Sequence, residues 1–160
     1  MKPDQIADLE RLLETQRILA LSVLVDTQPY VGLLPYALTP DRNTALVHAS
    51  GLARHTRGLQ QGAPFSVLIH RPDQPDGDPL QIERVMLQGS VEVLPKSSPE
   101  YQRARRSYVE RFPSSEQTFM LGDFNLYALR FESGRYVSGF AKAVNVTARD
   151  LARLASNDLA

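Results

Sequence analysis

The segment His48–Arg57 carries the side chains whose types and spacing best suit ligand chemistry. An apolar run ends there in a Ser-Gly turn, and basic and hydroxyl residues follow at the start of a predicted short helix over about residues 52–60. The first backbone amides of a helix lack intrahelical partners, and the helix dipole adds partial positive charge. Arg54, His55 and Arg57 would add charge and directed donors. This arrangement suits a phosphate monoester; a solvated helix with exposed arginines is the alternative.

Other catalytic or metal-binding patterns are absent from the sequence. The chain has no cysteine, which excludes disulfides, thiol nucleophiles and thiolate metal sites. Its histidines, His48, His55 and His70, lack paired metal-ligand spacing, so no metal site is predicted. It has no Gly-x-Ser-x-Gly elbow, no Gly-x-x-x-x-Gly-Lys loop and no Gly-x-Gly-x-x-Gly after a strand. The residues alone therefore identify no catalytic group.

The composition predicts one globular domain spanning residues 1–160. Hydrophobic residues make up 42% of the chain and charged residues 22%, which is too apolar for intrinsic disorder. The formal net charge of zero argues against a nucleic-acid-binding surface. The longest apolar stretch, Ile18–Val25, is too short to span a membrane, and the charged N-terminal residues exclude a signal peptide. We therefore expect a cytoplasmic protein.

Arginine dominates the basic residues. All but three of the 18 Lys and Arg residues are Arg. A GC-rich genome would explain the bias. Alternatively, some of these guanidinium groups bind a phosphate or a carboxylate through two hydrogen bonds.

Helices at the start, middle and end of the chain flank a series of strands joined by polar turns. The pattern predicts a helix from near Asp4 to near Gln16, strands at Ile18–Val25, Tyr30–Leu38, Thr44–Ala49, Pro64–His70 and Leu80–Leu94, a helix after Ser98, a hairpin of Asp123–Phe131 and Arg135–Val144, and a terminal helix from near Thr147. Short turns favour antiparallel pairing, because parallel strands need long crossovers. The prediction is an α+β fold, a small antiparallel barrel of six or seven strands with peripheral helices, with a β-sandwich as the alternative.

Three positions within these strands predict irregularities. Pro35 cannot donate to a ladder, so its strand is an edge or is bulged there. Gly89 predicts a bulge within the long strand Leu80–Leu94. Glu132 to Gly134 has turn composition and is predicted to connect the two strands of the last hairpin.

Several segments, in their order and spacing, resemble the pyridoxamine 5′-phosphate oxidase-like FMN-binding split barrels, and within them the haem-utilisation (HugZ/HutZ-type) proteins. The matching runs are Gln28–Leu38, Ser50–Arg57, Arg84–Val91, Asp123–Tyr127 and Gly134–Ala143. Together they extend over most of the chain. The resemblance implies an antiparallel split β-barrel that forms a homodimer, with FMN bound in the clefts between the subunits.

The resemblance also implies a set of cofactor-binding residues. The second strand would run along the flavin ring, mainly through backbone contacts. Arg54 and His55 correspond to an Arg-Lys pair on the FMN phosphate, with hydroxyl partners beside them, and Arg84 would approach the flavin from the same or the facing subunit. The residues so implied are Leu33, Leu34, Pro35, Tyr36, Ser50, Arg54, His55, Thr56 and Arg84.

The departures from the family pattern narrow the expected activity. The chain has no Trp and lacks the C-terminal Arg-Leu-His-type segment of the true oxidases, so vitamin B6 oxidation is not expected. Gly32 replaces a basic residue, and His55 in place of a lysine predicts pH-dependent phosphate binding. Residues 143–160 lack the iron-ligating His of the haem-degrading relatives, although Asp123 matches a family acid.

These observations favour a flavin-dependent oxidoreductase that acts on an unidentified small molecule. A haem-binding or haem-degrading protein is the first alternative, with His48, His55 or His70 as the available iron ligands. A non-catalytic flavin-binding dimer is the second. The catalytic residue, the substrate and the electron donor are not predicted.

Overall fold

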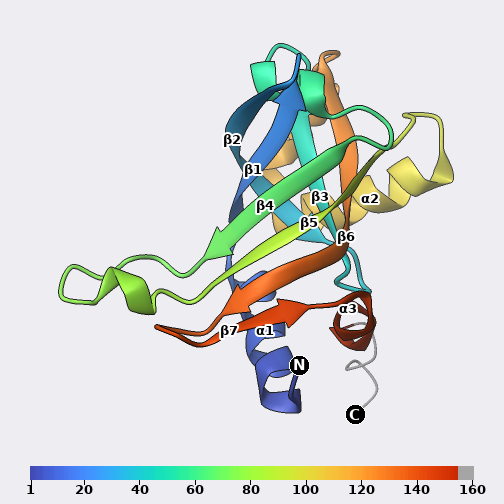
Figure 1. Ribbon diagram of the computed structural model, residues 1–160. Coiled ribbons are helices and arrows are strands. Elements are labelled where there is room, and N and C mark those ends of the chain that lie inside the picture. Colours follow the sequence, from blue (N-terminus) through green and yellow to red (C-terminus); the bar gives the residue numbers. More distant parts are fainter. Residues whose placement is uncertain (155–160) are drawn as a thin grey trace.

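The computed structural model describes residues 1–154, and the last six residues of the predicted domain lie outside the described part. The helices and strands follow one another in the order predicted for an α+β barrel (Figure 1). The elements are α1 (Pro3–Thr15), β1 (Ile18–Val25), β2 (Gln28–Leu38), β3 (Thr44–Ser50), η1 (Arg54–Gly58), β4 (Pro64–His70), η2 (Pro79–Gln81), β5 (Arg84–Val93), α2 (Pro99–Arg111), η3 (Pro113–Met120), β6 (Phe124–Val137), β7 (Ala143–Val146) and α3 (Ala148–Leu154), where η denotes a 3₁₀-helix.

The strands form one antiparallel sheet that closes on itself. Within residues 1–154 the order is β3-β2-β1-β4-β5-β6-β7, and a further pairing of β3 with β6 closes the first six strands into a barrel. Strand β7 extends the sheet beyond the end of β6 that is distant from β3. This closure confirms the predicted barrel over the β-sandwich. In the described chain no helix is long and apolar enough to cross a membrane.

Alternating side chains of the strands fill the barrel. On β1 the inward residues Leu19, Leu21 and Val23 are buried, and the residues between them face outward. The buried face of α1, which includes Leu9 and Leu12, belongs to the same cluster, so α1 closes one end of the barrel. Each fully buried leucine contributes roughly 1.5–3 kcal/mol relative to an exposed one.

Helix α2 packs on the outer face of the barrel and forms a second core. This smaller cluster joins α2 to β2, β3 and β6, and its buried members are Ala37, Leu46, Leu94, Tyr101, Ala104, Tyr108, Leu126 and Ala128. The Ser98 hydroxyl caps the helix by accepting a hydrogen bond from the Tyr101 amide at 3.1 Å, which confirms the predicted start.

The turn between β1 and β2 and the start of α3 follow their sequence signals closely. Asp26 and Thr27 both have positive φ, 51° and 65°, as a two-residue hairpin connection requires, so β2 begins at Gln28, two residues earlier than predicted. At the start of α3, Thr147 and Asp150 bond reciprocally, and the predicted capping box is confirmed.

The predicted hairpin across Glu132 to Gly134 is wrong. Strand β6 continues through these residues to Val137, and the chain reverses over residues 138–142 before β7. Gly134 lies opposite Leu87, and a Cβ at Gly134 would be 2.3 Å from the Met86 carbonyl oxygen. The glycine therefore permits close approach of β5 and does not make a turn.

The neighbouring strand β5 shows one confirmed and one shifted feature. Its register slips between Gln88 and Gly89, which confirms the predicted bulge. The strand begins at Arg84 and not at Leu80, because Pro79–Gln81 form η2, capped by the carboxylate of Asp78.

The short helix predicted over about residues 52–60 is present, but it is shorter than predicted and is not an α-helix. The segment is a 3₁₀-helix restricted to Arg54–Gly58, in which the Thr56 amide donates to the Ala53 carbonyl and the Leu59 amide to that of Thr56. Gly58 lies so close to β1 that a Cβ would be 2.8 Å from the Leu24 carbonyl oxygen. So short an element has no helix-dipole site, and any anion binding there depends on its side chains.

Candidate cofactor site

Strand β2 has an open edge at the end of the barrel that carries η1. It pairs with β1 from Gln28 to Pro35 but with β3 only from Tyr36 onward. The Tyr36 amide donates to the Arg17 carbonyl, on the β1 side, so by strand alternation the odd-numbered residues direct their backbone groups away from β1. Pro35 falls where β3 does not pair, which confirms the predicted edge position.

Val31 and Leu33 present both backbone groups and apolar side chains at this edge. Pro29 and Pro35 have no N–H, so the amides directed outward between them belong to Val31 and Leu33. Their side chains are 71% and 72% exposed and form an apolar strip on the outer face of β2. The edge thus offers donors, acceptors and a flat apolar surface, which suit a planar heterocycle.

The predicted second-strand residues divide between this surface and the core. Leu33 and Pro35 are exposed, whereas Leu34 and Tyr36 point into the barrel and are buried. The Tyr36 hydroxyl donates to the Leu13 carbonyl at 2.6 Å, and burial raises the pKa of this phenol. Leu34 and Tyr36 would influence a ligand only through the backbone that they fix.

Arg54 is the exposed cation beside this edge. Its guanidinium carbon lies 4.7 Å from the centre of the Tyr30 ring, and this cation–π contact holds the side chain in place. It forms no ion pair with any residue from 1 to 154, whereas the neighbouring Arg57 pairs with Asp26 at 3.4 Å. Arg54 therefore has donors available for an anion.

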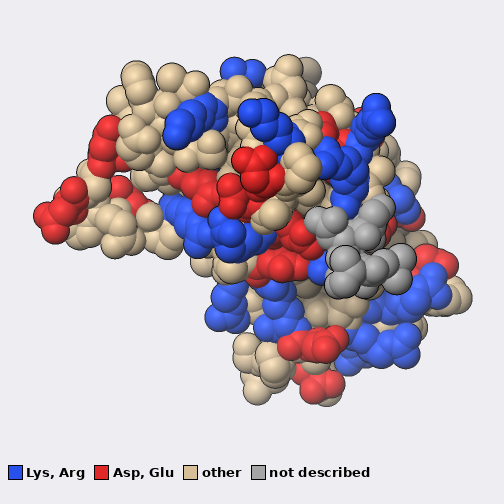
Figure 2. Space-filling model, turned by 90° about the horizontal axis from the view of Figure 1, so that it is seen from below, with Lys and Arg blue, Asp and Glu red and all other residues tan. Residues whose placement is uncertain are grey.

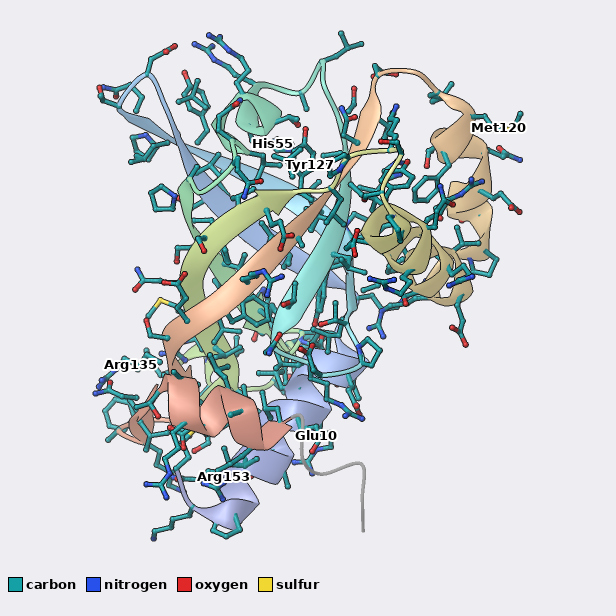
Figure 3. All side chains as sticks on the ribbon, turned by 90° about the vertical axis from the view of Figure 1, so that its right-hand side faces the viewer. Glu10, His55, Met120, Tyr127, Arg135 and Arg153 are labelled. Atoms are coloured by element: carbon teal, nitrogen blue, oxygen red, sulfur yellow. The ribbon has the colours of Figure 1, made fainter. Side chains whose placement is uncertain are left out.

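His55 is half-buried at the end of the barrel that carries η1 (Figure 3), and Thr56 beside it is buried. The His55 ring lies against Gly32, where a Cβ would be 2.7 Å from Nδ1. Burial lowers the pKa of His55, so the ring is neutral near pH 7. His55 Nε2 and Thr56 Oγ1 are buried without a hydrogen-bond partner among the described residues. In this arrangement both residues support η1 from inside.

Ser50 belongs to a network that fixes the loop before η1. Its hydroxyl donates to the Asp123 carboxylate and accepts a hydrogen bond from the Leu52 amide at 3.1 Å. The Gly51 amide donates to the Asp123 carbonyl at 2.7 Å. The loop that presents Arg54 is thereby tied to the start of β6.

Arg84 lies at the opposite end of the barrel from Arg54. It pairs with His70 at the end of β4, and its Nη1 donates to the Ile82 carbonyl at 2.8 Å. In Figure 3 the label of His55 marks the end of the barrel near Arg54. The label of Arg135, on strand β6 beside β5, marks the end near Arg84. Within one protomer the structure does not bring Arg84 to the other predicted cofactor residues.

The sequence did not indicate the roles of Tyr30, Val31 and Gly32. Tyr30 supports Arg54, Val31 extends the apolar strip, and Gly32 leaves room for His55. The alternation of β2 gave a signal for Val31. The contacts of Tyr30 and Gly32 depend on where η1 folds back, which no local pattern shows.

A separate groove of about 630 Å³ lies between α2 and the barrel. Its floor includes Leu46, Leu94 and Ala128, and charged residues such as Arg106 and Glu110 line its rim. None of the predicted cofactor residues lines it.

Comparison with known proteins supports the fold at low sequence identity. No family model matches the sequence, and no curated protein does. Among solved structures, a heme binding protein from Mycobacterium smegmatis has a TM-score of 0.81 at 22% identity, over 96% of this chain and 62% of that one. HutZ, a heme storage protein from Vibrio cholerae, has a TM-score of 0.71 at 19% identity, over 79% of this chain and 89% of its own.

A third structure connects the fold to the oxidases. It is a Clostridium acetobutylicum protein related to general stress protein 26 of the pyridoxinephosphate oxidase family, with a TM-score of 0.68 at 14% identity, over 94% of this chain and 99% of its own. The chain has the split-barrel fold of these proteins. The expected resemblance to split barrels that include HutZ is thereby confirmed at the level of fold. The chain spans 62% of the mycobacterial protein's length, so that protein carries additional sequence.

Proposed function

We propose that this split barrel binds a flavin, FMN, at the open edge of β2 and acts as a flavin-dependent oxidoreductase on a small molecule. The observation that carries the proposal is Arg54, an exposed guanidinium without an ion-pair partner in the described chain, held over Tyr30 beside that edge. A phosphate takes charge-assisted hydrogen bonds from such a group, and the fork geometry of arginine suits it. Membership of a structural neighbour in the pyridoxinephosphate oxidase family supports this choice.

The residues around Arg54 fit the remaining parts of such a cofactor. Val31 and Leu33 offer backbone groups to the polar edge of a flat ring and apolar side chains to its face. Ser50 and Asp123 hold the loop that presents Arg54. A bound flavin supplies the hydride chemistry, and the chain supplies binding, orientation and electrostatics.

We propose further that two copies form a homodimer through the outer face of β2, β1, β4 and β5. The register aligns Leu33, Ala20, Leu68 and Met86 in one row across these strands, and their side chains face outward. Leu33 and Met86 are exposed and Ala20 and Leu68 are half-buried, and an apolar surface row of this kind marks an interaction site. Such a dimer allows Arg84 of a second copy to approach the flavin.

Titration of the protein with FMN tests the flavin site. Quenching of FMN fluorescence gives Kd, and Arg54→Ala should raise it by about tenfold or more, because a charge-assisted contact to phosphate is lost. Arg106→Ala, an exposed arginine on α2, is the matched control and should leave Kd unchanged. Equal FMN affinity of the Arg54 variant and the wild type would contradict the site. Oxidation of NADH or NADPH by the loaded protein then tests the activity.

Haem binding is the second candidate, and His70 favours it. His70 is exposed on the outer face of β4, beside Leu68 and opposite Arg84. Its Nδ1 lies 2.7 Å from the Arg71 carbonyl oxygen, so the N–H belongs on Nδ1 and Nε2 keeps a lone pair for iron. The other two histidines have Nε2 buried. Two structural neighbours, a heme binding protein and a heme storage protein, support this candidate.

A hemin titration separates the two candidates. Haem ligation by His70 predicts a Soret shift that His70→Ala abolishes and His55→Ala retains. No shift in the wild-type protein, or the same shift in the His70 variant, would exclude His70 as an iron ligand.

A further inference from the structure

The connection between β4 and β5 projects from the barrel as an arm. Residues 72–80, here called the acidic arm, are all exposed, and Figure 1 shows them extending beyond the body of the molecule. The base of the arm is fixed: the Arg71 amide donates to the Glu83 carbonyl, and the two side chains form an ion pair at 2.9 Å. Gln81 accepts a hydrogen bond from the Phe140 amide at 3.0 Å. These contacts set the direction in which the arm leaves the barrel.

The arm carries charge of one sign. Asp73, Asp76 and Asp78 lie within it, and it contains no Lys, Arg or His. Asp78 caps η2 through the Leu80 amide at 2.9 Å, and Asp73 and Asp76 lie in the exposed stretch that precedes η2, here called the tip of the arm. Figure 2 shows acidic side chains at the projecting end of the molecule. The tip is therefore a negatively charged surface that stands away from the barrel.

The arm adjoins the apolar row proposed as the dimer face. Leu80, 58% exposed, lies at the arm's base, and Met86, 46% exposed, follows on β5. The other pole of this face carries η1, since Gly58 contacts β1 at Leu24, whereas the arm leaves from His70 and Arg84 at the opposite ends of the strands. Arm and η1 thus occupy opposite ends of one face.

Two copies can meet face to face in two ways that obey two-fold symmetry. A two-fold axis along the strands would place the two acidic arms beside each other, where like charges repel. A two-fold axis across the strands would place each arm over the η1 end of its partner. That end carries Arg54 and Arg57, and the Arg57–Asp26 pair is long, at 3.4 Å, with side chains 60% and 80% exposed. Charge complementarity favours the second arrangement.

We propose that the acidic arm of one copy docks on the η1 end of a second copy, where its tip carboxylates pair with Arg57. The proposal rests on the homodimer of the proposed function and extends it with an orientation and a contact. It also places the arm of each copy next to the partner's Arg54, so that the arm borders the proposed flavin site from the second subunit.

Charge reversal tests this contact. Asp73→Arg combined with Asp76→Arg should raise the dimer dissociation constant by about tenfold at low salt, because attraction becomes repulsion. Adding Arg57→Asp to the same chain should restore most of the affinity. Sedimentation equilibrium of the full chain without added flavin gives the constants. The matched control, Glu110→Arg with Glu116→Arg, reverses two exposed acids on the α2 side and should leave the constant within about twofold.

The possible outcomes distinguish the arm contact from the dimer on which it rests. Weakening by the arm variants with restoration by Arg57→Asp supports the docked arm. A dimer whose dissociation constant is insensitive to the arm variants, or weakening that Arg57→Asp does not reverse, overturns the arm contact and leaves the dimer. A monomeric wild-type chain at millimolar concentration overturns the arm contact and the dimer together. FMN affinity, measured separately, reports on the flavin site itself.

Discussion

At the scale of single residues, Gly32 and His55 form one packing unit. The sequence presents them as two departures from the family pattern, a lost basic residue and a lysine replaced by histidine. In the structure the His55 ring occupies the space of a Gly32 side chain, and η1 is held in the barrel mouth by this contact. Because burial lowers the pKa of His55, phosphate binding should not follow its titration near neutral pH, contrary to the sequence-based expectation.

Gly32→Ala should destabilise the protein by about 1–3 kcal/mol, because the new methyl group overlaps the His55 ring. In a His55→Ala background the same change should cost much less, since the ring is absent. Urea unfolding of the four variants gives the coupling between the two sites. Gly122→Ala is the control, with no atom near its Cβ position. Additive effects of the two substitutions would show that the packing unit does not exist.

His48 predicts how stability depends on pH. Burial, with Lys96 and Arg105 nearby, lowers its pKa to about 4, and its ring stacks on Phe119 at 3.8 Å between ring centres. The unfolded chain has a His pKa near 6.5 and takes up the proton first, so this contribution to stability is present above about 6.5 and declines as the pH falls toward 4. The loss amounts to about 3 kcal/mol at most.

The difference in unfolding free energy between the wild type and His48→Phe isolates this residue. Phenylalanine keeps the stacking and does not titrate. The difference should therefore change between pH 7 and pH 4.5, with the wild type losing more stability, and urea titrations at each pH measure it. A difference that is constant with pH would mean that His48 has the same pKa in the folded and the unfolded chain, which would contradict the effect of burial.

At the scale of elements, local pattern predicted the strands better than their connections. The bounds of β1 and β4 agree with the predicted apolar runs, because a short apolar run between turn residues is typical of a strand that packs on a core. The shifted bounds near residues 52–60 and the wrong turn at residues 132–134 each involve a glycine that packs closely against another strand. Gly58 approaches β1 and Gly134 approaches β5, and neither contact is local in the sequence.

Gly134→Ala should therefore destabilise the barrel, by about 2 kcal/mol or more, because its Cβ would meet the Met86 carbonyl oxygen. Ser133→Ala, at the adjacent exposed position, should change the unfolding free energy by less than about 0.5 kcal/mol. Thermal unfolding followed by circular dichroism compares the two. A harmless Gly134→Ala would mean that β5 and β6 separate locally at this point.

At the scale of the whole molecule, the candidate site is divided between the ends of the barrel. The sequence resemblance grouped Arg84 with Arg54, but strand register decides their distance, and it places them at opposite ends of the outer face. The order of the segments predicted the barrel, because short turns pair consecutive strands in antiparallel fashion, as β1 pairs with β2 and β2 with β3. It gave no separation between residues on non-adjacent strands, so only the structure shows that Arg54 and Arg84 lie far apart within one protomer.

FMN binding should then depend on the proposed dimer, whereas dimer formation without flavin should not depend on Arg54. Met86→Asp puts a charge at the β5 end of the apolar row and should convert the protein to a monomer and weaken FMN binding, although Arg54 is untouched. Met120→Asp, at an 84% exposed methionine on η3, is the matched control and should change neither property. Arg54→Ala should reduce FMN affinity and leave the dimer intact. Light scattering after size-exclusion chromatography measures the oligomeric state, and FMN titration measures the affinity. A monomeric Met86 variant with wild-type FMN affinity would mean that one protomer holds the complete site.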